Sequence, residues 1–162
     1  MQASLQPIVH LYGTTDRLVG DVVSSLDEND LVHAPEGWNS VLRLWGHLAV
    51  VRHRLLNVLT GQQEAIPFEE SCGWYPTDDP LPSREEVDAA YALVSDRLRA
   101  AFEALSDDDL AGPGRGQGVF PTDDQTLLGT IAFLGYHEAY TVGQMGYVGH
   151  LIGKLPRDGV LG

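Results

Sequence analysis

The fold is decided by one stretch near the C-terminus, Gly135-Tyr136-His137-Glu138-Ala139-Tyr140-Thr141-Val142-Gly143-Gln144-Met145-Gly146. The spacing of its apolar residues predicts the middle of a long helix with His137 on its inner side. Thr141 follows His137 by one turn, and Gln144 follows one turn later. Two metal ligands four residues apart lie on one helix face and can hold one ion. Here only the first of these two positions is occupied by a metal-binding side chain.

Three other segments show the same helical periodicity. The first runs from about residue 5 to residue 26, and the second follows the N-cap pair Asn39-Ser40 and ends at Gly61. The third begins with a capping box at Ser83 and continues to about residue 105, and the C-terminal helix opens with a capping box at Thr122 and ends near residue 152. Strand signals are nearly absent, so the sequence predicts an all-α chain.

A short acidic motif occurs twice, at residues 26–31 and 105–110, where it is expected to close the first and third helices. Each copy is followed by an irregular loop and then by a helix that carries a histidine, His47 or His137. Two explanations are open: an internal duplication of the chain, or a chance match between acidic turns, which are common. Two helical hairpins related by a pseudo-two-fold axis would place the second and fourth helices together. The long loops, 62–82 and 111–121, would then connect helices by crossovers or wall a site at one end of the bundle.

Composition restricts the class of protein. The length of 162 residues predicts one domain over residues 1–162. The net charge of −13 argues against binding to nucleic acid or to anionic membranes. No segment resembles a signal peptide or a membrane span. The single cysteine, Cys72, excludes an internal disulfide and is typical of a reducing compartment, so we expect a cytoplasmic protein. Cys72 has no histidine near it in sequence, which favours a spectator thiol over a nucleophile.

Helical position separates the six histidines. His10 and His53 fall opposite the apolar stripes of their helices and are expected to be exposed, His33 lies in a turn, and His150 projects from a polar side. His47 and His137 lie on or beside apolar stripes and are expected to face inward. One inward histidine is more often a hydrogen-bonded core residue than a ligand, but two from adjacent helices favour a shared metal site.

Two charged residues and three glycines also require an explanation. Arg52 and Glu138 fall near the centres of their apolar stripes, so we expect them to form an ion pair, unless either reaches solvent. Three glycines recur at intervals of three in the last helix, where each costs about 1 kcal/mol relative to alanine. These glycines are Gly143, Gly146 and Gly149. They are either tolerated on an exposed side or form a smooth strip against another helix, of this chain or of a second subunit.

Three motifs together resemble the DinB/YfiT-like superfamily. They are Trp38-Asn39-Ser40-Val41 leading into Trp45-Gly46-His47-Leu48-Ala49, the run from His137 to Gln144, and the ending Gly149-His150-Leu151-Ile152-Gly153. The resemblance covers nearly the whole chain. It implies a four-helix bundle in up-down-down-up order, commonly dimeric, in which many members hold a divalent metal through one histidine of the second helix and a His-x-x-x-His pair of the fourth. Members of known activity include metal-dependent thiol transferases and a mycothiol-dependent isomerase.

By this resemblance His47 and His137 are metal ligands, and the third ligand position falls on Thr141, whose hydroxyl is a poor ligand for zinc or nickel. We therefore expect weak binding of such an ion in a site lined by Thr141, Gln144, Glu138 and Arg52. The expected function is that of a metal-dependent enzyme, a transferase or hydrolase, which acts on a small molecule with a low-molecular-weight thiol. The alternative is a non-catalytic, metal-free dimeric bundle that binds a small apolar ligand or a protein partner.

Overall fold

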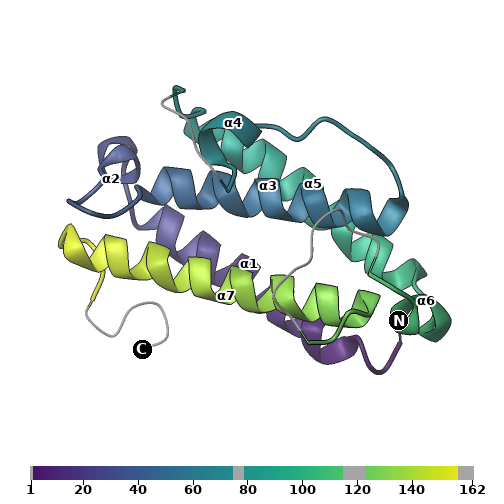
Figure 1. Cartoon of the computed structure of the whole chain (residues 1–162). Coiled ribbons are helices and arrows are strands. Elements are labelled where there is room, and N and C mark those ends of the chain that lie inside the picture. Colours follow the sequence, from purple (N-terminus) through teal and green to yellow (C-terminus); the bar gives the residue numbers. More distant parts are fainter. Residues whose placement is uncertain (1, 75–78, 115–122, 157–162) are drawn as a thin grey trace.

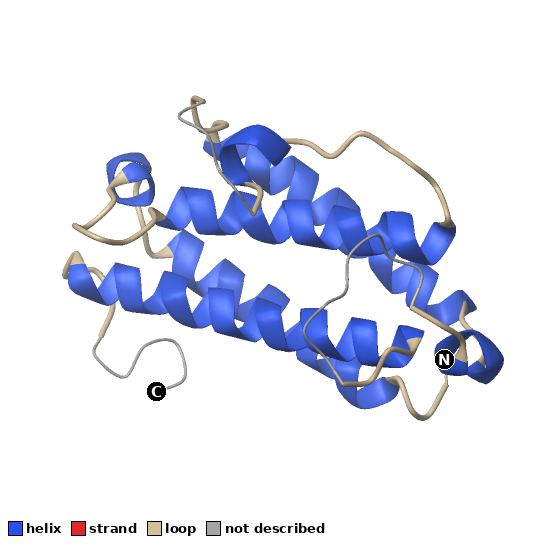
Figure 2. Cartoon of the chain, in the orientation of Figure 1, coloured by secondary structure: helices blue, strands red, loops and turns tan. Residues whose placement is uncertain are grey.

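The structure is a computed structural model that describes residues 2–74, 79–114 and 123–156. In these ranges the chain forms helices and no strand, so the prediction of an all-α chain is confirmed (Figures 1 and 2). The four long helices are α1 (Gln6–Ser24), α3 (Val41–Thr60), α5 (Arg84–Ala104) and α7 (Leu127–Leu151). The short helices are α2 (Glu28–Val32), α4 (Glu69–Cys72) and α6 (Asp107–Ala111). None of these helices is both long enough and apolar enough to cross a membrane.

Local signals account for most helix ends. The Ser40 side chain accepts a hydrogen bond from the Arg43 amide at the start of α3, and Gly61 ends α3 with a φ of 69°, the left-handed conformation that glycine adopts readily. Ser83 caps α5 with the predicted capping box. The last helix was expected to open with a capping box at Thr122, and this prediction is wrong. The helix, α7, begins at Leu127 with Thr126 as its N-cap, and Thr122 lies outside the described residues.

The two acidic motifs do more than close helices. Each forms a short helix of its own, α2 or α6, with a reciprocal capping box between residues three apart. Asp27 pairs with Asp30 in α2, and Ser106 pairs with Asp109 in α6. Acidic residues in the first turn also favour a helix through the helix dipole. The two motifs are therefore alike in structure as well as in sequence.

The long helices lie along one another, α1 beside α7 and α3 beside α5, with α3 also against α7 (Figure 1). Hydrogen bonds from Arg84 to the carbonyl oxygens of Val23 and Leu26 hold the start of α5 at the end of α1. An ion pair of 2.9 Å between Lys154 and Asp30 holds the segment after α7 beside α2. This arrangement makes α3 and α7, the helices that carry His47 and His137, direct neighbours.

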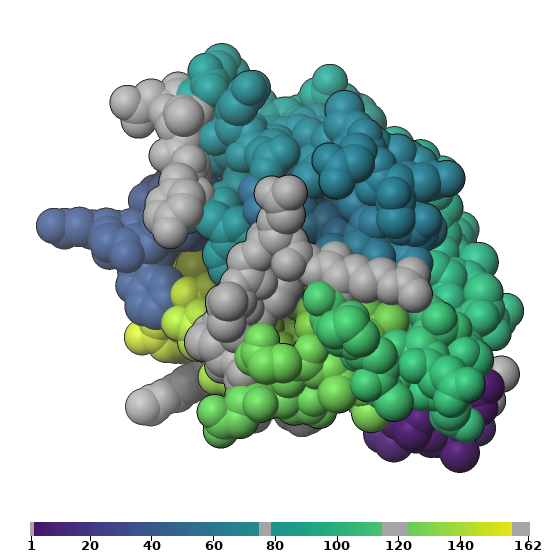
Figure 3. All heavy atoms as spheres, turned by 45° about the vertical axis from the view of Figure 1, so that its right-hand side comes forward, coloured from purple at the N-terminus to yellow at the C-terminus, as the bar shows by residue number. Residues whose placement is uncertain are grey.

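The predicted loop 62–82 contains a helix. Within it, α4 packs on α3, and the contact depends on Gly46, because a Cβ atom there would lie 2.6 Å from the Cys72 sulfur. The end of α3 and the segment after it, in blue-teal, come to the same face of the molecule as the first residues of α7, in green (Figure 3). The glycine-rich loop 111–121 lies mostly outside the described residues.

The expectation that His53 is exposed is wrong. Only 7% of its surface is accessible, and its Nε2 atom lies 3.7 Å from a Glu64 carboxylate oxygen. Helical phase fails here because α3 is covered on more than one side, by α5, α7 and α4. Phase relative to an apolar stripe identifies exposed residues only when the opposite side of the helix faces water.

Gly143, Gly146 and Gly149 of α7 do not form a single strip. Gly143 is exposed with open space around it, whereas Gly146 and Gly149 are buried. A Cβ atom at Gly149 would lie 2.5 Å from a Leu155 side-chain carbon. At that position the close approach is therefore made by the chain's own turn after α7.

Candidate functional site

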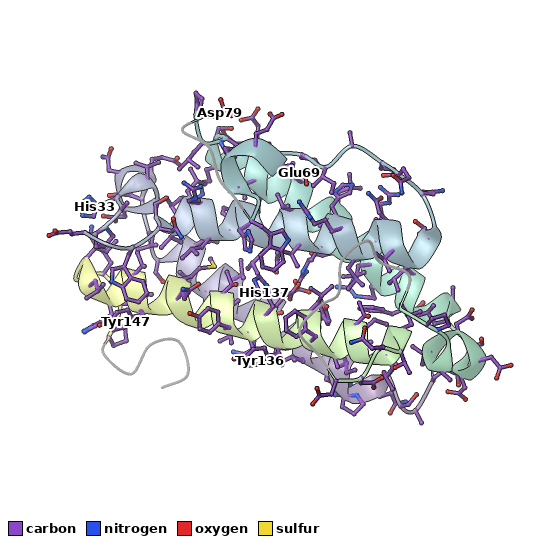
Figure 4. All side chains as sticks on the ribbon, in the orientation of Figure 1. His33, Glu69, Asp79, Tyr136, His137 and Tyr147 are labelled. Carbon is purple, nitrogen blue, oxygen red and sulfur yellow. The ribbon has the colours of Figure 1, made fainter. Side chains whose placement is uncertain are left out.

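A pocket of about 220 Å³ lies between α3 and α7 beside the end of α4. The two inward histidines, His47 and His137, both line it, as do Thr141 and Gln144. Figure 4 shows His137 on the side of α7 that faces α3, whereas Tyr136 points away from it. The remaining lining residues are Asn39, Arg43, Leu44, Cys72, Gly73, Trp74 and Tyr140.

The two imidazoles meet across the pocket, with 3.4 Å between their Nε2 atoms. The Nδ1 atom of His47 lies 2.8 Å from the backbone carbonyl oxygen of Cys72. A carbonyl oxygen only accepts hydrogen bonds, so Nδ1 of His47 carries the hydrogen and its Nε2 carries a lone pair. Within the described part of the chain, Nδ1 of His137 is buried without a hydrogen-bond partner. A hydrogen there would be left unpaired, so in the metal-free protein His137 carries its hydrogen on Nε2 and donates it to His47.

Burial keeps both imidazoles neutral at physiological pH. It lowers the pKa of His137, and His47 lowers it further, to about 4. Burial also lowers the pKa of His47, although the bond to the Cys72 carbonyl oxygen opposes this effect. Neutral imidazoles are the form that binds metal ions and accepts protons.

The third ligand position is occupied by a group already used in the helix. The Thr141 hydroxyl donates a hydrogen bond of 3.0 Å to the His137 carbonyl oxygen. Across the described ranges, no cluster of three or more histidine, cysteine, aspartate or glutamate side chains is placed to hold a metal ion. The pocket therefore offers a pair of imidazoles, not a triad.

Sequence reasoning missed two residues that α4 brings to this pair. Cys72, expected to be a spectator in a loop, is buried at the pocket, where its carbonyl oxygen orients His47 and burial raises the pKa of its thiol. Trp74 lies against both imidazoles, with ring centroids 4.7 Å from His137 and 5.3 Å from His47. The available signal was the length of loop 62–82, which suggested a wall for a site but did not identify its residues.

Arg43 and Asn39 also line the pocket and were missed. Arg43 precedes His47 by four residues, which places both on one side of α3, and this spacing was readable in the sequence. Asn39 precedes the N-cap Ser40, so helical spacing could not place it. The polarity of both residues made them resemble ordinary surface residues.

The predicted ion pair between Arg52 and Glu138 is present and buried, with 2% and 1% of the side chains exposed. The guanidinium donates to both carboxylate oxygens, at 2.6 and 2.7 Å. Arg52 also bonds Asp16 and Ser95, and the Thr15 hydroxyl donates to Glu138. Burial lowers the pKa of Arg52, but Glu138 outweighs this effect and raises it. Neither Arg52 nor Glu138 lines the histidine pocket, so their expected place in its wall is not observed.

Comparison with known families identifies a family model. The model, described as DinB superfamily, matches residues 11–145, which include both pocket histidines and the four long helices except for a few terminal residues. A comparison with curated proteins gives no match.

Proposed function

The chain belongs to the DinB superfamily, and from this membership we propose that its pocket is the site of a metal-dependent enzyme that acts on a small molecule. His47 and His137 would hold a zinc or nickel ion weakly, and a low-molecular-weight thiol would be the second reactant. The observation that carries the proposal is the 3.4 Å approach of the two Nε2 atoms, with the lone pair of His47 directed into the pocket by the Cys72 carbonyl oxygen.

The separation of the His47 and His137 Nε2 atoms is suitable for two ligands of one such ion. Zinc binds histidine nitrogen at about 2.0–2.1 Å with tetrahedral angles, so two ligand nitrogens stand about 3.3–3.4 Å apart. The His47 and His137 nitrogens already have this separation. A divalent ion, when bound, lowers the pKa of a coordinated water or thiol and so supplies a nucleophile at neutral pH.

Two features weaken the site. The side chain at the third position is Thr141, whose hydroxyl is a poor ligand for zinc or nickel and already bonds the His137 carbonyl oxygen. A metal on Nε2 of His137 would also move the imidazole hydrogen to Nδ1, where the described residues provide no acceptor. Metal-binding histidines usually donate this second N–H to a neighbouring group. We therefore expect an affinity well below that of a three-histidine site.

The proposal includes the arrangement typical of the family, a four-helix bundle in up-down-down-up order. The position of Arg84 at the end of α1 supports it, because α5 then begins where α1 ends. The position of Lys154 beside α2 supports the parallel course of α7 and α1. In such a bundle the sites lie between facing helices, as this pocket does.

A second candidate function follows from Thr141. Because the hydroxyl is engaged and no three-ligand cluster occurs among the described residues, the pocket also fits a metal-free bundle that binds a small ligand without catalysis. This alternative predicts that the wild-type protein binds neither zinc nor nickel. The first candidate predicts weak binding by the wild-type protein, so a metal titration distinguishes the two.

The test is metal titration of protein purified without an affinity tag, with elemental analysis of the purified protein. We expect the wild-type protein to bind zinc or nickel weakly, and Thr141→His to bind at least tenfold more tightly, because it supplies the missing imidazole at i+4. Ala139→His is the matched control, since it adds the same group to the exposed side of α7. Equal affinities for the wild-type protein and Thr141→His would mean either that another residue already completes the site or that the pocket is not a metal site. No detectable binding by the wild-type protein would overturn the first candidate and favour the second.

A further inference from the structure

The charge of the histidine pocket is opposite to that of the chain. The sequence has 23 acidic and 10 basic residues, yet the described residues that line the pocket include no aspartate or glutamate and one arginine, Arg43. The pocket is thus a small positive region on an acidic protein, which favours an anionic organic ligand.

Arg43 is the one cationic side chain in the described ranges that has no carboxylate partner. The other arginines and the lysine there each lie within 4 Å of an aspartate or glutamate. One terminal nitrogen of Arg43 is buried and, in the same ranges, lacks any hydrogen-bond partner. A buried guanidinium nitrogen without an acceptor is costly, and an acceptor from a ligand would remove that cost.

The rest of the pocket indicates the size and character of that ligand. Its volume of about 220 Å³ suits a small molecule, and the ring of Trp74 and the side chains of Tyr140 and Leu44 provide apolar contact. A planar guanidinium matches a planar carboxylate with two parallel hydrogen bonds. One guanidinium balances a single negative charge, whereas a phosphate dianion would leave charge unbalanced.

We propose that the pocket binds a small monocarboxylate through Arg43, with the apolar part of the ligand against Trp74 and beside the two imidazoles. Arg43 lies one turn before His47 on α3, so a carboxylate held there directs the body of the ligand toward His47 and His137. The inference rests on the proposed function only in taking this pocket as the binding site, and it requires no metal.

The test uses benzoate as the probe and benzamide as its neutral counterpart of similar shape, in protein kept metal-free with a chelator. Binding is followed by NMR through the Trp74 indole and the Gly73 amide, and by calorimetry. We expect benzoate to shift both signals and to bind at least tenfold more tightly than benzamide. Arg43→Gln should reduce benzoate affinity at least tenfold, and Arg43→Lys should reduce it less, because it keeps the charge but loses the paired geometry.

Arg97→Gln is the control, since Arg97 pairs with Glu64 and does not line the pocket. It should bind benzoate as the wild-type protein does. Equal binding of benzoate and benzamide, or unchanged benzoate affinity in Arg43→Gln and Arg43→Lys, would overturn the inference. Tighter binding of inorganic phosphate than of benzoate would overturn the assignment to a monocarboxylate. Because no metal is present, a negative zinc titration leaves this result unaffected, and a negative benzoate titration leaves the zinc result unaffected.

Discussion

The Nε2 atoms of His47 and His137 are close enough to share one hydrogen or one ion. Which nitrogen of each imidazole carries the hydrogen depends on what its Nδ1 atom contacts. The Cys72 carbonyl oxygen fixes the hydrogen of His47 on Nδ1, so the reactive lone pair faces the pocket. His137 has no such group among the described residues, and its Nδ1 atom is buried without a partner. The two imidazoles are therefore not equivalent, and His137 is the one whose environment resists an added proton.

This resistance makes the stability of the protein depend on pH. Burial and the neighbouring His47 lower the pKa of His137 to about 4 in the folded protein, against 6.5 for an unperturbed histidine. The unfolded chain then binds this proton more tightly, so the free energy of unfolding falls as pH drops from about 6.5 to about 4. The full shift would correspond to about 3 kcal/mol, and the loss is smaller because solvent screens the partly buried imidazole. Denaturant unfolding of metal-free protein at pH 7, 5.5 and 4.5 measures it.

His137→Gln does not titrate and should lose less stability over this range than the wild-type protein. His10→Gln is the control, because it removes a histidine that is exposed on α1 and does not line the pocket. An equal pH dependence for His137→Gln and the wild-type protein would show that His137 does not titrate with a lowered pKa.

Helix phase and the family resemblance were sufficient to select His47, His137, Thr141 and Gln144, all of which line the pocket. They did not select Cys72, Trp74 or Arg43. Cys72 and Trp74 reach the site only because α4 folds back on α3, where Gly46 leaves room for the Cys72 sulfur. A contact between two segments that are packed together only in the folded chain produces no periodic pattern in the sequence. Arg43 lies one turn before His47, so helix phase could have identified it, but an arginine on a helix usually faces water.

At the scale of the helices, the register of α3 against α7 is held by a polar cluster in the core. Arg52 of α3 and Glu138 of α7 bond through two parallel hydrogen bonds, and Asp16 of α1 and Ser95 of α5 complete the arginine's partners. All four long helices thus contribute to one cluster. The sequence predicted the pair from helix phase, whereas the contributions of α1 and α5 depend on the packing of the whole fold. Because Glu138 follows His137 directly, this cluster also fixes the part of α7 that carries the imidazole.

A double-mutant cycle with Arg52→Met and Glu138→Gln tests this cluster. Arg52→Met should cost about 3–5 kcal/mol of unfolding free energy, because it leaves the Glu138 carboxylate buried without its cation. Glu138→Gln should cost less, since Arg52 keeps its ion pair with Asp16. The double mutant should be less destabilised than the sum of the single mutants. Thermal and denaturant unfolding provide the free energies.

Arg17→Met is the control for the loss of an arginine. Arg17 is 63% exposed and pairs with Asp21 at the surface, so its removal should cost about 1 kcal/mol or less. Strictly additive effects of Arg52→Met and Glu138→Gln would mean that the two side chains do not stabilise one another.

At the scale of the whole molecule, the outer side of α7 differs from the other surfaces. Every exposed residue of this helix is uncharged, although the chain carries a net charge of −13, and α5 exposes six charged side chains. Tyr136 is 66% exposed, and it heads a row of exposed residues along the helix, namely Tyr136, Tyr140, Gly143, Tyr147 and Leu151. A helix that is apolar on all sides is usually covered on all sides. The sequence did not predict this surface. It predicted a strip of Gly143, Gly146 and Gly149 instead, and of these three glycines only Gly143 is exposed.

The spacing of this row favours a second copy of the chain as the cover. Tyr136 and Leu151 are equally distant from the point between Gly143 and Gln144, and so are Tyr140 and Tyr147. In an antiparallel pair of α7 helices about a two-fold axis at that point, Tyr140 faces the partner's Tyr147, and Gly143 lets the helices approach closely. Two strongly acidic copies also repel one another least through an uncharged face.

We therefore expect a homodimer, as the family resemblance implies, with α7 at its interface. Tyr136→Glu should weaken the dimer at least tenfold, because it places a charge in an apolar contact from both copies. Leu93→Glu is the matched control, since Leu93 is an exposed apolar residue of α5, and it should leave assembly unchanged. Analytical ultracentrifugation over a range of micromolar concentrations measures both. A wild-type monomer throughout that range would refute the dimer, and equal assembly of the wild-type protein and Tyr136→Glu would move its interface away from α7. Because Tyr140 lines the histidine pocket, a dimer through α7 would also bring the partner's Tyr147 to the wall of that pocket.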